Sequence, residues 1–134
     1  MERQLPRHEI GIARIVSGSF AAVVARTEAA LKDQGFGVLT RIDVKATMKE
    51  KLDVDVAANV ILGACNPPLA HKALTIEPRM GLLLPCNVVV RQEGSAVRVE
   101  AIEPFAMVEM FPERDLTAVA AEASDRLRRA IEAI

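Results

Sequence analysis

The sequence contains no Trp and no Tyr, and only four Phe among its 134 residues. Proteins that hold single-stranded nucleic acid stack bases on aromatic side chains, and this chain offers almost none. Its formal net charge is −1, so no overall positive field attracts phosphate groups. We therefore expect that the protein does not bind nucleic acid.

The sequence also lacks an apolar run long enough to cross a membrane. Its longest uncharged apolar stretches, around residues 60–65 and 80–85, fall far short of the roughly 20 residues that a span requires. The N-terminal sequence MERQLPRHEI mixes charges throughout and has no apolar centre of the kind that a secretory signal carries. These features predict no membrane association and a cytoplasmic location, where cysteines stay reduced.

Hydrophobic residues make up 51% of the chain, which is enough to bury a core built from Val, Leu, Ile, Ala and Met. The length fits one domain, and no linker, internal repeat or low-complexity segment divides it. We expect residues 1–134 to form a single domain.

The first half of the chain reads as strand, helix and strand. Residues 10–16 predict a strand with Ile10, Ile12 and Val16 on one side. Ser19 is placed to cap a helix whose apolar residues recur at helical spacing, and the GFG sequence at 35–37 ends it, with Gly35 suited to a left-handed conformation. The alternation in VLTRIDV, residues 38–44, is typical of a half-buried strand.

The middle of the chain continues with a short helix, a strand and another helix. Residues 45–51 favour a short helix. In residues 52–56 a buried row of Leu52, Val54 and Val56 is expected to alternate with aspartates that face solvent, so Asp43, Asp53 and Asp55 are not expected to bind magnesium. Residues 60–65, VILGAC, predict an interior strand buried on both faces, and a helix follows over 67–76.

The last third predicts a hairpin and a long helix. Residues 88–90 and 97–101 form its two strands, the first of which must begin after Pro85, with a turn at Glu93–Gly94. An amphipathic helix follows at about 115–133. A hairpin together with two amphipathic helices predicts an α+β fold, a two-layer sandwich in which helices cover a mostly antiparallel β-sheet.

The segment ILGACNPPLAHKAL, residues 61–74, holds most of the candidate chemistry. Asn66 is a strong helix cap and Pro67 fits the first helical position, so both have a structural explanation. Cys65 directly precedes the helix, whose dipole favours a thiolate. Pro67 and Pro68, however, remove two N–H donors that an anion would use, so a buried and inert cysteine is the alternative.

The Cys-Asn pair recurs at Cys86–Asn87, at the start of another predicted strand. If the two strands are neighbours, Cys65, Cys86 and His71 could meet and hold zinc, iron or copper(I), or Cys65 and Cys86 could form a disulfide. The spacing matches no zinc signature, and a fourth ligand would have to be Asp43 or solvent, so we expect no metal. Phosphate-binding loops and the common hydrolase motifs are missing from the sequence, which leaves enzymatic activity open.

Three sequence blocks together resemble one known family. They are AALKDQGFGVLTRIDVKATMKEKLDVDV, VILGACNPPLAHKAL and PRMGLLLPCNVVV. Together they resemble the Domain of Unknown Function 302 family, and the resemblance spans about residues 19–102. It implies a single α+β domain with a helix-covered, mostly antiparallel sheet, often dimeric, and it implies no reaction. The family pattern maps onto Gly35, Gly37, Asp43, Asn66, Pro67, Gly81, Leu84 and Pro85; the sequence departs from it at Pro68, where relatives carry a lysine or a similar polar residue.

Three functions remain open at this stage. The first is a non-catalytic small-ligand-binding or interaction module, acting as a homodimer, whose ligand contacts Cys65, Asn66, His71, Cys86 and Asn87. The second is a thiol-dependent redox protein in which Cys65 reacts, Cys86 resolves and His71 acts as base. The third is a metal or haem binder that uses Cys65, His71 and Cys86. We expect the first, with the cofactor undetermined.

Overall fold

The computed structural model of the chain describes residues 8–134. The strands are β1 (Gly11–Val16), β2 (Gly37–Asp43), β3 (Asn59–Cys65), β4 (Cys86–Glu93) and β5 (Ala96–Ile102). The helices are α1 (Phe20–Asp33), α2 (Val44–Leu52), α3 (Pro67–Ile76), the 3-10 helix η1 (Pro78–Leu82), α4 (Pro104–Val108) and α5 (Thr117–Glu132).

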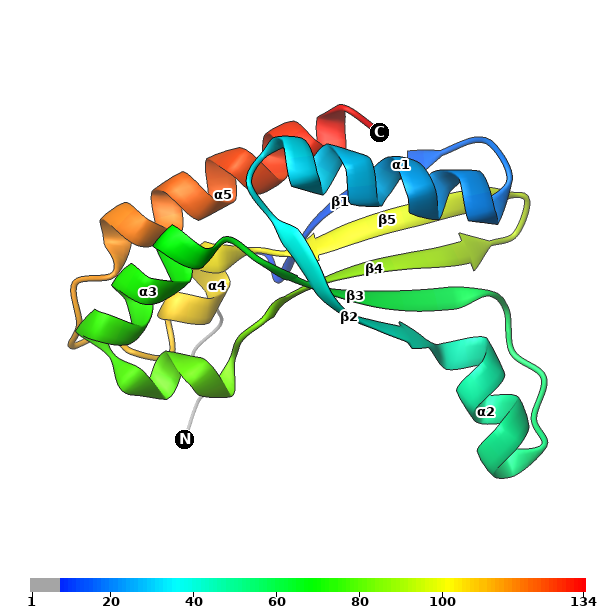
Figure 1. Cartoon of the computed structure of the whole chain (residues 1–134), viewed down its shortest axis with the longest axis horizontal. Helices are drawn as coiled ribbons and strands as arrows, with labels where there is room; N and C mark the ends of the chain where they lie inside the picture. The colour runs from blue at the N-terminus through cyan, green and yellow to red at the C-terminus, as the bar shows by residue number, and fades with distance from the viewer. Residues whose placement is uncertain (1–7) are drawn as a thin grey trace, which may run out of the picture.

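The five strands form one sheet in the order β1-β5-β4-β3-β2, and every neighbouring pair is antiparallel. Helices α1 and α5 lie along one face of this sheet, whereas α2 projects on the opposite side (Figure 1). The predicted α+β fold with an antiparallel sheet covered by helices is therefore confirmed.

Local signals explain where the helices begin and end. The Ser19 hydroxyl accepts the N–H of Ala22 at 3.2 Å and caps α1, and Gly35 follows the helix with a φ of +85°, a conformation that strains residues with a Cβ. Pro67 occupies the first position of α3, as expected. The predicted caps thus set these boundaries.

The main core lies between the covered face of the sheet and helices α1 and α5. Alternate residues of the strands point toward the helices, so each strand contributes one apolar row. The fully buried members of this core include Val23, Leu31, Phe36, Leu62, Val88, Val90, Val97, Val99 and Leu127.

Polar contacts fasten α5 to the sheet. The Arg14 guanidinium in β1 donates to the backbone oxygens of Glu132 and Ile134, each at 2.7 Å, and so neutralises the negative end of α5. Directly after β5, the buried Glu103 accepts a hydrogen bond from Ser124 at 2.7 Å and one from Arg128 at 3.2 Å. These contacts fix α5 near its middle and at its C-terminal end.

The opposite face of the sheet is uncovered, and several sequence expectations are corrected there. Residues 60–65 are fully buried on one face, whereas on the other face Gly63 is buried but Ile61 and Cys65 are partly exposed. Strand β2 is almost entirely exposed rather than half-buried, with Ile42 at 47% exposure, and its alternation is interrupted by an irregularity between Val38 and Thr40. Ile10 lies before β1 and is 72% exposed, not in the core.

Residues 44–58 also differ from expectation. The helix begins at Val44, because the Asp43 carboxylate accepts the Ala46 N–H at 2.9 Å, and it ends where Asp53 adopts a left-handed conformation. The predicted buried row does not form, since Leu52 is 66% exposed and Val54 is 45% exposed. A short helix after β5, α4, was not predicted at all.

In the part of the chain that the structure describes, no helix combines the length and the apolar character that a bilayer span requires.

Candidate functional site

The ends of β3 and β4 that carry the Cys-Asn pairs lie side by side. Cys86 is directly opposite Ala64 and Asn87 is opposite Gly63, so Cys65 and Cys86 lie at the same end of the sheet. Helix α3 starts at this point, since Asn66 follows Cys65 directly. The strand adjacency on which the candidate site depends is therefore present.

Asn66 has a structural role at the start of α3. Its side chain is 8% exposed, and its Oδ1 accepts the Leu69 N–H at 3.3 Å. A Cβ on Gly35 would lie 2.9 Å from Nδ2 of Asn66, so the amide also packs closely against the turn that follows α1. Because Pro67 and Pro68 have no N–H and the Leu69 N–H is already bound, this helix start offers little to an anion.

The two thiols differ in exposure. Cys86 is buried, whereas Cys65 is half-buried, and both are free, so the disulfide considered above is not formed. Burial in an apolar environment, with a smaller contribution from the nearby Cys65, raises the pKa of the Cys86 thiol to about 11. At neutral pH roughly one molecule in ten thousand would carry the Cys86 thiolate that a resolving thiol needs.

The remaining predicted site residues lie elsewhere. His71 is exposed on α3, and Asn87 is exposed on β4. Among residues 8–134 no group of three or more His, Cys, Asp and Glu side chains is arranged to hold a metal ion. Asp43, the suggested fourth ligand, instead caps α2. The structure thus brings Cys65, Asn66 and Cys86 to one site, without His71 and Asn87.

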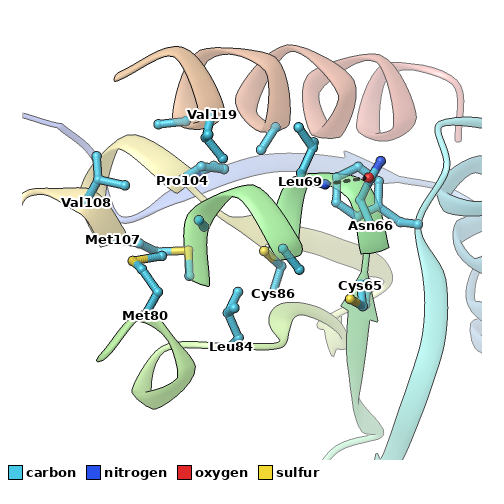
Figure 2. Close-up of a pocket in the computed structure, with 16 residues that line it drawn as sticks. Cys65, Asn66, Leu69, Met80, Leu84, Cys86, Pro104, Met107, Val108 and Val119 are labelled. Carbon is cyan, nitrogen blue, oxygen red and sulfur yellow. Dashed lines mark hydrogen bonds between the residues drawn. The ribbon is translucent and has the colours of Figure 1, made fainter. Parts of the chain in front are cut away.

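These three residues border an apolar cavity of about 50 Å³ (Figure 2). It lies where the ends of β3 and β4 meet helices α3, α4 and α5. Most of its lining is aliphatic or thioether in character, and the residues that line it include Cys65, Asn66, Leu69, Ala73, Met80, Leu84, Cys86, Pro104, Met107, Val119, Ala120 and Ala123.

Sequence reasoning did not identify most of this lining. Met80, Cys86 and Met107 belong to one buried cluster with Ala73 and Leu116, although they come from η1, β4, α4, α3 and the segment before α5. Met often fills irregular apolar spaces in protein cores. The sequence feature that could have indicated this lining is that Met80 and Met107 lie in short helices that begin with proline. Only the fold shows that these segments converge.

A second, more polar cavity of about 400 Å³ lies beside η1 and the segment that follows α4. Two of its charged side chains are paired with each other, since Glu77 accepts hydrogen bonds from Arg114 and also from the Arg79 N–H. These contacts, led by the Arg79 N–H, hold the pKa of Glu77 below its ordinary value. We assign this cavity a structural role.

The antiparallel five-stranded sheet covered by helices on one face places this chain among the small α+β proteins. The family model described as "Domain of unknown function DUF302" matches residues 12–134, which extends the similarity beyond residues 19–102 to the end of α5. The chain therefore belongs to the DUF302 family.

A solved structure supports this assignment. The crystal structure of an uncharacterized conserved DUF302 protein from Bacillus stearothermophilus is 31% identical in sequence and superposes with a TM-score of 0.85. The match covers 93% of this chain and 98% of that chain. No curated protein matches the sequence.

Proposed function

We propose that this protein is a non-catalytic module that binds a small apolar ligand in the cavity at the ends of β3 and β4, and that it acts as a homodimer. The observation that carries the ligand-binding part is the cavity itself, which lies at the strand ends where the Cys-Asn pairs meet. Apolar pockets with few polar groups are the usual form of small-molecule sites.

The size and lining of the cavity define the ligand class. A water molecule takes about 30 Å³ in the liquid and requires two to four polar partners, and dry apolar cavities bind xenon or benzene instead. The cavity has about 50 Å³ and offers Asn66 as its amide group, which is already engaged with Leu69. It therefore suits a small apolar molecule or the end of an alkyl chain.

The groups around the cavity favour binding over catalysis. An ordinary thiol is already mostly protonated at neutral pH, and the raised pKa of Cys86 lowers its thiolate fraction about a hundredfold further. His71, the proposed base, is exposed and does not line the cavity. A general base must lie within hydrogen-bond reach of the proton that it removes, and His71 is not placed for that role.

Xenon tests the ligand-binding part directly. Under a few atmospheres of xenon we expect ¹H–¹⁵N shifts of amides in α3, α4 and the ends of β3 and β4, and toluene tests whether the cavity opens for a larger molecule. Ala73→Val adds two methyl groups at a buried lining position and should abolish the xenon shifts. The matched control, Ala25→Val, makes the same change at an exposed position of α1 and should leave them intact.

Two outcomes would overturn the proposal. One is the absence of xenon and toluene shifts at the lining residues of the wild-type protein. The other is binding that Ala73→Val and Ala25→Val affect equally, which would place the ligand elsewhere.

The homodimer part rests on a different observation, the uncovered face of the sheet. An antiparallel sheet can expose one face to water, but here that face carries several large apolar side chains. Analytical ultracentrifugation of the full chain should give a mass near twice 14.5 kDa. A monomer at micromolar concentration would refute this part and leave the ligand-binding part standing.

A further inference from the structure

Two largely exposed features of the molecule lie on the same side of it. The first is the open face of the sheet, defined here as Ile15, Ile42, Ile61, Val89, Arg91, Arg98 and Glu100. The second is the arm, defined as residues 44–58, which comprises α2 and the segment that leads to β3. Figure 1 shows the arm extending on the side of the sheet that faces away from α1 and α5.

The open face follows from the strand register. Ile61, Val89 and Arg98 each lie between two buried residues of their strand, so their side chains point away from the helices. Ile42 is opposite Ile61 and Ile15 is opposite Arg98, which places both on the same face. Ile15 is 57% exposed and Ile42 is 47% exposed, so the face is both apolar and accessible.

The arm is held by local polar contacts, including the Lys45 hydrogen bond to the Val56 carbonyl at 2.8 Å, but no residue of its helix is buried. Helix α2 has nine residues and none of them is buried. Isolated helices shorter than about 12 residues are marginal in water, and most helical stability in proteins comes from packing of an apolar face. The Asp43 cap and the Lys49–Asp53 pair contribute locally, but Leu52 and Val54 at the end of the arm remain exposed.

Both surfaces carry exposed charged side chains that could meet across an interface, although each also has an ion partner within its own chain. Arg91 and Arg98 are directly opposite each other on β4 and β5, and like charges in that position are destabilising. The tip of the arm carries Asp53 and Asp55, whose side chains are 87% and 81% exposed and share Lys49 between them. Glu93 lies 3.4 Å from Arg91 and Glu100 lies 3.4 Å from Arg98, so aspartates from another molecule would add to these ion pairs rather than replace a missing partner.

Topology shows how a second copy would bring these groups together. Strand β4 is central in the sheet, so a two-fold axis parallel to β4 exchanges the β2 side of one copy with the β1 side of the other. The arm follows β2 at the end of the sheet where Arg91 and Arg98 lie. The rotation keeps that end, and it therefore places the arm of each copy beside Ile15 and Arg98 of the other.

We propose that the open face and the arm together form the surface on which a second copy of this chain docks, with Asp53 and Asp55 of each copy facing Arg91 and Arg98 of the other. This inference rests on the proposed homodimer and names its interface. The available area supports it: five strands about 4.8 Å apart, with about six residues of 3.3 Å rise each, present roughly 480 Å² of projected face. With the arm added, this approaches the about 800 Å² per partner of a stable interface.

Complementary charge reversal tests the interface. Arg98→Glu alters the face and Asp55→Lys alters the arm, so each variant alone sets like charges against each other twice in its own dimer. We expect each to raise the dimer dissociation constant about tenfold or more, as measured by sedimentation equilibrium. An equimolar mixture should form a heterodimer of wild-type affinity, because both of its charge contacts are then between opposite charges.

Two further variants complete the test. Ile15→Asp changes a side chain that is exposed in the single chain, so it should give a folded monomer. Arg129→Glu, at an exposed position of α5 on the covered side, is the matched charge control and should remain dimeric. Circular dichroism of each variant verifies the fold.

The outcomes distinguish a failure of the proposed interface from a failure of the proposed homodimer. A wild-type protein that is monomeric refutes both the interface and the homodimer. A wild-type dimer that Arg98→Glu, Asp55→Lys and Ile15→Asp all leave unchanged refutes the interface alone, as does a mixture that fails to recover dimerisation.

Discussion

Because the thiol of Cys86 is buried, the free energy of unfolding of the protein should decrease in alkaline solution. Its pKa in the folded chain is about 11, raised from 9.0 mainly by burial, and the side chain is 8% exposed. The unfolded chain therefore loses the thiol proton at a lower pH than the folded chain does. The free energy of unfolding is unaffected by this group below pH 9, and it falls as pH rises from 9 toward 11.

The magnitude follows from the difference of two pKa units. Each unit corresponds to 1.36 kcal/mol, so Cys86 should reduce the free energy of unfolding by about 2–3 kcal/mol between pH 8 and pH 11. Chemical denaturation of the wild type and of Cys86→Ala over this range isolates the effect, because all other groups titrate in both proteins. We expect the wild type to lose more stability with rising pH than the variant.

Alkylation provides an independent measurement of the same pKa. In Cys65→Ala, where Cys86 is the single thiol, iodoacetamide at pH 8 should react about a hundredfold more slowly with the folded protein than with the same protein in denaturant. Cys86→Ala serves as the control in which only Cys65 reacts. Parallel stability curves, or equal alkylation rates in the folded and denatured states, would show that the cavity does not desolvate Cys86.

Two further predictions concern buried carboxylates. Ser124→Ala removes the 2.7 Å hydrogen bond to the buried Glu103 and should lower the free energy of unfolding, measured in urea titrations, by about 1.5–3 kcal/mol. The control Ser95→Ala, in the exposed β4–β5 turn, should change the free energy of unfolding little. An equal effect of the two substitutions would contradict the role given to Glu103. Because its pKa is lowered, Glu77 stabilises the fold above the ordinary value of 4.5, and this contribution disappears as pH falls below 4.5 through the folded pKa. Glu77→Gln should therefore be less stable than the wild type at pH 7 and should approach it in acid, and a constant difference between pH 7 and pH 3 would be inconsistent with this reasoning.

Much of the fold follows from local sequence signals. The Ser19 cap, Gly35, the Asn66-Pro67 pair and the Glu93-Gly94 turn predicted boundaries that the structure places within one or two residues. These signals act through backbone hydrogen bonds and allowed dihedral angles, which depend on neighbouring residues only. Helix boundaries and the hairpin were therefore accessible without a structure.

Burial was predicted less well, because it depends on which faces are covered. The alternation over residues 38–44 and 52–56 was interpreted as a buried apolar row, yet β2 lies at an edge of the sheet and residues 53–58 lack regular structure. Alternation shows that one face is more apolar than the other, but it does not show that anything packs against that face. If the open face binds a second copy, these same residues become buried in the dimer.

The candidate site was predicted in part. The Cys-Asn repetition raised the hypothesis that two strand ends are neighbours, and in the structure the ends of β3 and β4 lie side by side with Cys65, Asn66 and Cys86 at one cavity. The exposed positions of His71 and Asn87 depend on the helical phase of α3 and on the strand register, neither of which a single sequence fixes. Met80, Met107 and α4 could not be assigned to the cavity, because their convergence is a property of tertiary packing.

Strand β3 connects two distant regions of the molecule, since it starts next to the arm and finishes at the cavity. Its seven residues, at about 3.3 Å each, separate those regions by roughly 20 Å. Substitutions more than about 10 Å apart with no shared neighbours usually have additive energetic effects. Substitutions that line the cavity should therefore leave the arm and the open face unchanged, and substitutions in the arm should leave the cavity unchanged.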